Sequence, residues 1–208
     1  MVRTAYLFAA AVLLLAAAGA VSANLLLNPG FEDPIGTEWT VTIVSGNPSS
    51  WFTDRSAASA YTGSYGFELR FGPIAETGKA YVQQVVSNLV PGGACTVTGW
   101  LKFLWRADKD WGYIEALGGG APVQAPAKGA NTVGSWMQYT LNQTADANGQ
   151  LTVRLWLDKY TTTTADKTCT VYFDDVVVEG PLIPEPGSVV AVLTGLIGLA
   201  GLGIRRRR

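Results

Sequence analysis

The stretch CTVTGWLKF, residues 95–103, alternates between apolar and polar side chains and decides the fold class. The stretch LTVRLWLD, residues 151–158, follows the same rule, with leucine or valine at every second position. Successive residues of a strand point to opposite faces, so each stretch predicts a β-strand with one face against a core. One tryptophan stands on the polar face of each strand, Trp100 in the first and Trp156 in the second.

The rest of the chain between residues 24 and 180 has the pattern of an all-β domain. Short runs rich in Val, Thr, Tyr, Phe and Trp are separated by clusters of Gly, Pro, Asn and Asp. We expect strands at residues 24–27, 39–44, 66–71, 81–86, 95–105, 113–117, 135–142, 151–157 and 170–179. Residues 118–134 and 161–164 are expected to be loops. So many strands in one domain curl into two packed sheets, which predicts a β-sandwich.

The first 23 residues have the three regions of a secretory signal peptide. Arg3 supplies the positive charge, residues 5–18 form an apolar run, and the small residues Val21-Ser22-Ala23 suit a cleavage site. We expect a signal helix that is removed after Ala23, so that the domain of residues 24–180 is exported.

The C-terminal end carries a second hydrophobic segment. Pro184-Glu185-Pro186 lies in a linker, residues 181–188, and is followed by an apolar run and then Arg205, Arg206, Arg207 and Arg208. The run would form a helix of roughly 25 Å, barely enough for a bilayer core. A block of arginines holds its end in the cytoplasm.

This order resembles the PEP-CTERM sorting signal of Gram-negative bacteria, which an exosortase-type membrane protease recognises and removes. The resemblance implies that residues 189–208 are a hydrophobic sorting helix with a basic tail. It also implies transient insertion into the inner membrane, followed by the outer surface or the extracellular matrix. The alternative is an ordinary single-span anchor.

The charge of the exported domain differs from that of the whole chain. The chain has 15 Lys and Arg residues against 16 Asp and Glu residues, but Arg3 and the four terminal arginines lie outside the domain, as does Glu185. The net charge of the domain is therefore about −5. No basic stripe remains, so we do not expect a nucleic-acid partner.

The two cysteines, Cys95 and Cys169, each stand at the start of a predicted strand. A disulfide can persist outside the cell, and we expect a bridge between them. The alternative is a pair of buried thiols.

Several short motifs point to a family. In order they are NLL (24–26), NPGFE (28–32), GSY (63–65), VQQV (82–85), PGG (91–93) and YFDDV (172–176). Together they resemble the landmarks of carbohydrate-binding modules of families 4 and 9. The resemblance implies a galactose-binding-like jelly-roll sandwich of two antiparallel sheets, in which the first and last strands lie close together. That fold also occurs in matrix proteins and receptors, so it does not by itself establish sugar binding.

The same resemblance implies a structural calcium ion where the chain ends meet. Glu32 matches the N-terminal carboxylate ligand of the family, and the pair Asp174 and Asp175 matches the C-terminal one. Calcium takes several oxygen ligands, which two carboxylates and backbone carbonyls could supply. The alternative is a set of solvated acids at strand ends.

Sugar binding follows from the alternation as well. An indole on an exposed sheet face can stack on a sugar ring while neighbouring polar groups bind its hydroxyls. We expect one such site with Trp100 and Trp156 at its centre, and with Lys102, Arg154 and Asp158 as the polar residues beside them. Further aromatic residues near the charged turn at 106–110 are candidate rim contacts, namely Trp105, Trp111 and Tyr113. The alternative is that a loop such as 118–134 covers a tryptophan and makes a second small core.

Catalysis is not expected. The chain has no histidine, which excludes Ser-His-Asp and Cys-His sites. Glycosidases need a pair of carboxylates, whereas Glu68 and Glu115 each stand alone on a predicted strand. The sequence therefore predicts an exported, non-catalytic polysaccharide-binding protein, with a structural envelope or biofilm-matrix protein as the alternative.

Overall fold

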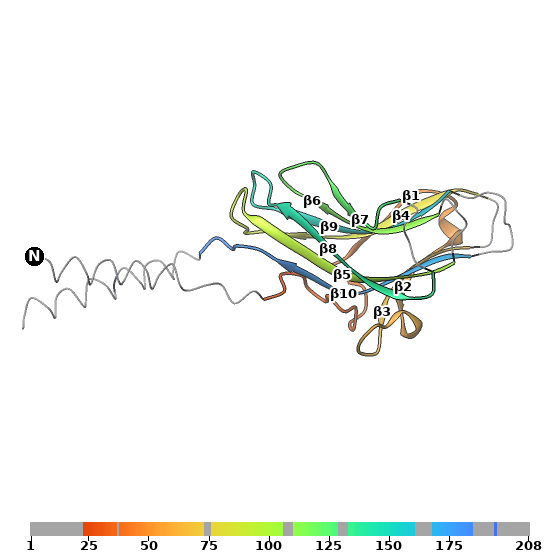
Figure 1. Ribbon diagram of the computed structural model, residues 1–208. Helices are drawn as coiled ribbons and strands as arrows, with labels where there is room; N and C mark the ends of the chain where they lie inside the picture. Colours follow the sequence, from red (N-terminus) through yellow and green to blue (C-terminus); the bar gives the residue numbers. More distant parts are fainter. Residues whose placement is uncertain are drawn as a thin grey trace, which may run out of the picture.

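The computed structural model describes residues 23–36, 38–72, 76–105, 110–128, 133–160, 168–184 and Thr194. Ten strands form two five-stranded sheets that lie one above the other (Figure 1). Sheet A has the order β1 (Thr40–Ser45), β4 (Gly78–Val86), β9 (Leu151–Lys159), β6 (Trp111–Leu117) and β7 (Val123–Ala125). Sheet B has the order β2 (Trp51–Ser56), β3 (Gly66–Phe71), β10 (Cys169–Glu179), β5 (Ala94–Trp105) and β8 (Trp136–Thr144).

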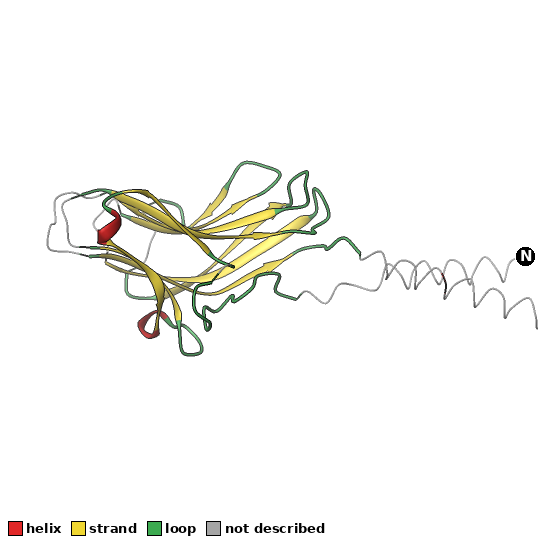
Figure 2. Cartoon of the chain, turned by 180° about the vertical axis from the view of Figure 1, so that it is seen from behind, coloured by secondary structure: helices red, strands yellow, loops and turns green. Residues whose placement is uncertain are grey.

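All neighbouring strands within the two sheets are antiparallel. Two short 3-10 helices flank β2, η1 (Pro48–Ser50) before it and η2 (Ala57–Ser59) after it (Figure 2). The predicted all-β sandwich is therefore confirmed for the described residues. The expected signal and sorting helices lie outside them.

The core lies between the two sheets and is built from the alternating residues of their strands. On β5 the inward side chains of Val97 and Phe103 are fully buried, and on β9 those of Leu151 and Leu155 are too. The alternation in residues 95–103 and 151–158 thus assigns the core face of both strands correctly. Trp39 is also buried, and its indole nitrogen donates to the carbonyl of Leu27 at 3.1 Å.

Strand β10 contains a bulge at Asp174 and Asp175. Its pairing with β5 shifts register between Asp174 and Val177, and Asp175 adopts a positive φ of 46°. A bulge inserts an extra residue and resets which side chains face inward. Phe173 and Val176, three positions apart, are consequently both fully buried.

The N-terminal segment packs beside the second half of β10. Asn24 donates its side-chain amide to the carbonyl of Val176 at 2.9 Å and accepts from the amide of Val178 at 3.0 Å. The amide of Leu25 donates to the carbonyl of Val178 at 3.0 Å. The prediction of a strand at residues 24–27 is therefore wrong, because this segment forms only isolated hydrogen bonds with β10 and no regular β-ladder. The expected closeness of the two chain ends is correct.

Two strands were not predicted from the sequence. In β2, Trp51 and Phe52 are followed by polar residues, so the sequence shows no alternation of apolar and polar side chains. The strand pairs with β3 along its whole length. β7 is a three-residue edge strand inside the predicted loop 118–134, paired with β6. Both are at sheet edges, where pairing with a single neighbour leaves a weak hydrophobic pattern.

The expected disulfide is not formed, since Cys95 and Cys169 are both free and buried. Cys95 starts β5 and lies beside Gly180, whereas Cys169 starts β10, which runs antiparallel to β5. The two positions are thus separated by about the length of β10, roughly 33 Å, against the 7 Å limit for bridged Cα atoms. Burial raises the pKa of both thiols.

Pro184 is exposed at the end of the described domain. Glu185, Pro186 and the terminal residues Arg205, Arg206, Arg207 and Arg208 lie outside the described residues. Within the part of the chain that the structure describes, no helix has the length and apolar character needed to cross a membrane.

Candidate functional site

Trp100 and Trp156 lie on opposite outer faces of the sandwich. Trp100 is on β5 of sheet B, and Trp156 is on β9 of sheet A. Each points away from the core shared by the two sheets, so the core separates them. The expectation of a single site with both tryptophans at its centre is therefore wrong, and the two faces are considered separately.

On sheet A, four rings form what we call the Trp156 cluster: Tyr81, Trp111, Tyr113 and Trp156. Tyr81, Trp156 and Tyr113 are opposite one another on three neighbouring strands. The rings of Trp111 and Tyr113 stack with centroids 3.8 Å apart, and those of Tyr81 and Trp156 are 4.3 Å apart. Trp156 is 6 % exposed and Tyr113 is 1 % exposed.

Charged and amide side chains close the edges of this cluster. Glu115 accepts a hydrogen bond from the indole nitrogen of Trp156 at 2.9 Å and one from Gln124 at 2.6 Å, and it lies 3.6 Å from Arg154. Arg154 in turn donates to Gln83 at 2.9 Å. The polar groups around Trp156 are thus paired with one another.

A second ion pair lies at the other side of Trp156. Lys79 is 3.6 Å from Asp158, and its ammonium lies 4.6 Å from the centre of the Trp156 ring. The expected partners Arg154 and Asp158 are therefore next to Trp156, as the alternation predicts, but each already has a protein partner.

The connection after β7 covers the other end of the cluster. The indole nitrogen of Trp111 donates to the carbonyl of Pro126 at 3.0 Å, and Pro126 is buried. Burial, and then the nearby Glu115, raise the pKa of Tyr113. Trp111 and Tyr113 are therefore not exposed rim residues. The alternative of a second small core, covered by a part of residues 118–134, describes this face.

On sheet B, aromatic rings remain partly open to solvent. We define the Trp100 patch as Tyr61, Trp100, Lys102 and Trp136. Tyr61, in the loop after η2, stacks on Trp100 with ring centroids 4.0 Å apart and an interplanar angle of 23°. Trp136 is 5.4 Å from Tyr61 at 58°. Tyr61 is 39 % exposed, and both tryptophans are half-buried.

Polar side chains border the Trp100 patch. Gln138, the exposed partner of Trp100 on β8, stands beside it, and the ammonium of Lys102 is 6.0 Å from the Trp136 ring. Trp136 starts edge strand β8 and lies on the outer face, opposite Lys102. Tyr61 was not predicted as a site residue, because it lies in a loop, where the sequence has no periodic pattern.

Asp174 holds Tyr61 in place over Trp100. One carboxylate oxygen of Asp174 accepts from the amides of Tyr61 at 2.7 Å and Thr62 at 3.1 Å, and the other accepts from the amide of Asp175 at 2.8 Å. Asp174 is 1 % exposed. Burial raises its pKa from 3.8 to about 6, although these hydrogen bonds act in the opposite direction.

The other two expected calcium ligands also bind protein groups. Glu32 accepts from the amides of Ser64 at 2.8 Å and Tyr65 at 3.2 Å, while Asp175 accepts from the hydroxyl of Thr62 at 2.8 Å. In the described part of the chain, no three Asp, Glu, His or Cys side chains gather as a metal site. The carboxylates in this arrangement hold the loop at 61–65. Calcium binding therefore stays a prediction.

The last expected site residue, Trp105, ends β5. Its side chain lies outside the described part of the structure.

Comparison with known proteins gives structural relatives only. No protein-family model matches the chain, and no curated protein does. The structure of TmCBM61 in complex with β-1,4-galactotriose is similar, with 18 % identity, a TM-score of 0.55, and coverage of 76 % of this chain and 99 % of that one. The CBM22-1 xylan-binding domain from Paenibacillus barcinonensis Xyn10C has 14 % identity, a TM-score of 0.52, and coverage of 80 % and 100 %.

A Stig cyclase, Fisc from Fischerella sp. TAU, is similar to the same degree. It shares 14 % identity, with a TM-score of 0.54 and coverage of 78 % of this chain and 100 % of the cyclase. At such identities the likeness establishes the fold. The β-sandwich of this chain is thus one that carbohydrate-binding modules use and that a cyclase uses as well.

The burial of the Trp156 cluster predicts a large effect on stability. Replacing Trp156 by alanine removes a buried ring and leaves Glu115 without its indole donor, which should lower the free energy of unfolding by about 3–5 kcal/mol. Chemical denaturation of the full-length chain measures this.

Trp100→Ala is the matched control, since it removes a half-buried tryptophan from the other face. Its expected cost is about 1 kcal/mol. Equal losses for both substitutions would contradict the assignment of Trp156 to a second core.

The raised pKa of Asp174 predicts a specific pH dependence. Because the folded pKa, about 6, is above the ordinary value of 3.8, protonation favours the folded state. This stabilising contribution is present below about pH 4 and is lost as the pH rises through 6. In the presence of a chelator, the stability advantage of the wild type over Asp174→Asn should be larger at pH 4.5 than at pH 7.5.

The same pair of proteins tests calcium. If calcium binds at Asp174, adding it at pH 7.5 should raise the melting temperature of the wild type and leave that of Asp174→Asn unchanged. A melting temperature that calcium does not change in the wild type would refute calcium binding.

Proposed function

We propose that this chain is an exported, non-catalytic polysaccharide-binding protein and that the Trp100 patch is its sugar-binding surface. The observation that supports it most directly is the partly exposed group of three aromatic rings around Trp100. The likeness to TmCBM61 and to a xylan-binding domain agrees with it, because both use this fold.

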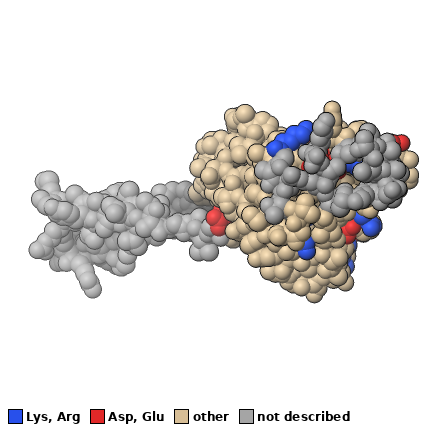
Figure 3. Space-filling view, turned by 45° about the vertical axis from the view of Figure 1, so that its right-hand side comes forward, with Lys and Arg blue, Asp and Glu red and all other residues tan. Residues whose placement is uncertain are grey.

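The geometry of the patch suits a sugar ring. Trp136 is tilted by 58° to Tyr61, so the two rings form adjacent walls on which the C–H face of a pyranose can stack. Lys102 and Gln138 stand at the border and can hydrogen-bond to its hydroxyls. On the side of the domain drawn in Figure 3, the described charged side chains are few and of both signs.

One argument for the non-catalytic assignment is that the two buried glutamates lie far apart. Glu68 lies on the outer face of sheet B, paired with Arg70 at 3.3 Å, and Glu115 lies on the outer face of sheet A, paired with Arg154. The core of the sandwich separates them, so they cannot flank one glycosidic bond. The chain also has no histidine.

Export rests on the sequence alone. The signal peptide before Asn24 and the PEP-CTERM-like tail after Pro184 support secretion, processing by an exosortase-type protease and a final place at the cell surface or in the extracellular matrix. The domain between them closes on itself through Asn24, which agrees with removal of both ends.

One observation favours the alternative of a structural envelope or matrix protein. Tyr61 already stacks on one face of Trp100, so that face is unavailable to a sugar. A structural spacer would use the same stack only to fix the loop at 61–65. Binding measurements separate the two functions.

Replacing Tyr61 or Trp136 by alanine should weaken retention by polysaccharide about tenfold, because each removes one stacking wall. Affinity electrophoresis of the full-length chain through gels containing β-1,4-galactan, xylan or cell-free exopolysaccharide measures retention.

Tyr160→Ala is the control, since Tyr160 is 54 % exposed but far from this face, at the end of β9. It should leave retention unchanged. A wild type that none of the three polysaccharides retains would favour the structural alternative.

Processing of both ends gives a separate prediction. In a Gram-negative host that has an exosortase, the mature protein should begin at Asn24 and lack Arg205 to Arg208. Intact-mass spectrometry of the exported protein tests this, and Glu185→Ala should block removal of the tail. A mature protein that keeps the four arginines would indicate an ordinary anchor.

A further inference from the structure

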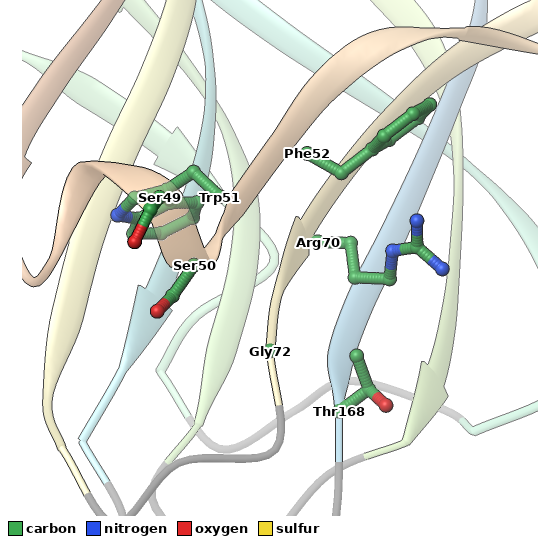
Figure 4. A pocket seen from close by; sticks show the side chains of 7 residues that line it. All are labelled: Ser49, Ser50, Trp51, Phe52, Arg70, Gly72 and Thr168. Carbon is green, nitrogen blue, oxygen red and sulfur yellow. The ribbon is translucent and has the colours of Figure 1, made fainter.

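A pocket of about 470 Å³ opens at the end of sheet B where β10 begins. It is lined by residues of η1, β2, β3 and the start of β10, namely Ser49, Ser50, Trp51, Phe52, Arg70, Gly72 and Thr168 (Figure 4). It is a shallow depression that is open to solvent. Neither aspartate nor glutamate lines it, although the domain as a whole is acidic.

Arg70 is the one charged side chain of this lining, and its position is fixed. Its guanidinium lies 4.7 Å from the centre of the Phe52 ring, and its Nε is 3.3 Å from Glu68. In the ion pair the carboxylate is 9 % exposed and the guanidinium 45 %. The positive end of the pair therefore faces solvent and the negative end faces the protein.

The two terminal nitrogens of Arg70 are available to a ligand. Among the described residues, neither forms a hydrogen bond. These nitrogens form a planar fork that matches the two oxygens of a carboxylate. The hydroxyl of Thr168 stands in the same lining, and the ring of Phe52 supplies apolar surface beside Arg70. Trp51 points to the other side of β2, toward Phe71 and Ser45. A guanidinium, a hydroxyl and an aromatic ring together suit a sugar that carries a carboxylate.

We infer that this pocket binds a uronic acid unit of an acidic polysaccharide, with its carboxylate on the fork of Arg70. The inference rests on the proposed polysaccharide binding and names the class of polymer. Arg70 on β3 is opposite Thr170 on β10, and Tyr172, two residues further along β10, is opposite Lys102 on β5. The pocket and the Trp100 patch therefore share the outer side of sheet B. One polymer chain can therefore contact both.

The experiment compares polygalacturonate with its fully methyl-esterified form, in which each carboxylate is replaced by a neutral methyl ester. With calcium chelated, the full-length wild type should be retained about tenfold more strongly by the acid form, the effect expected of one bidentate charge-assisted pair. Arg70→Gln should abolish this preference. Arg70→Lys keeps the counter-charge of Glu68 but lacks the fork, and should reduce the preference without loss of stability.

Arg55→Gln is the matched control. Arg55 is on the same strand as Phe52 and also lies over an aromatic ring, 4.2 Å from that of Tyr65, but it does not line the pocket. Its loss changes the net charge equally and should leave the preference intact. Equal retention of both polymers by the wild type, or equal losses for Arg55→Gln and Arg70→Gln, would overturn the inference.

The outcomes also separate this inference from the proposed function. If neutral polysaccharides are retained in a way that depends on Tyr61 and Trp136, while the acid form gains nothing, the pocket inference fails and the proposed function stands. If no polysaccharide is retained in either form, both fail.

Discussion

Strand β10 must satisfy three different neighbours, and the arrangement of sheet B depends on how it does so. Its first half pairs with β3 and β5, and its second half pairs with β5 and contacts the N-terminal segment through Asn24. The bulge at Asp175 makes this possible, since it lets both Phe173 and Val176 face the core. It also aims Asp174 at the amides of the loop at 61–62, so the same irregularity that closes the core places Tyr61 over Trp100.

The two outer faces carry similar residues but differ in how far their aromatic rings are exposed to solvent. Both carry tryptophan beside tyrosine, basic and amide side chains. On sheet A the rings stack on one another across three central strands, and paired Glu115 and Arg154 complete a dry layer. On sheet B the aromatic residues gather near edge strand β8 and a loop, where Trp136 stays half-buried beside Tyr61 and Lys102. Position within the sheet, more than residue type, decides which tryptophan stays accessible.

Alternation in the sequence was enough to find the long central strands. It assigned the inward residues of β5 and β9 and the bounds of β3, because a strand with one buried face has a strict two-residue period. It could not assign strands to sheets, and so it joined Trp100 and Trp156 in one site. The separation of Cys95 from Cys169 likewise follows from the antiparallel pairing of β5 and β10, a long-range contact without a local signal. The sequence shows no two-residue alternation of apolar and polar side chains at edge strands β2 and β7 or at the loop residue Tyr61, so it did not predict them.

Both ends of the described domain leave from the same end of the sandwich, beside the last residues of β10 (Figure 1). The pocket at Arg70 and Thr168 lies at the opposite end, where β10 begins, roughly 33 Å away along the strand. If the protein were held to a surface through either terminus, this pocket would lie at the end of the domain farthest from the point of attachment. The length of β10 would then separate the attached end of the domain from the proposed uronic acid site.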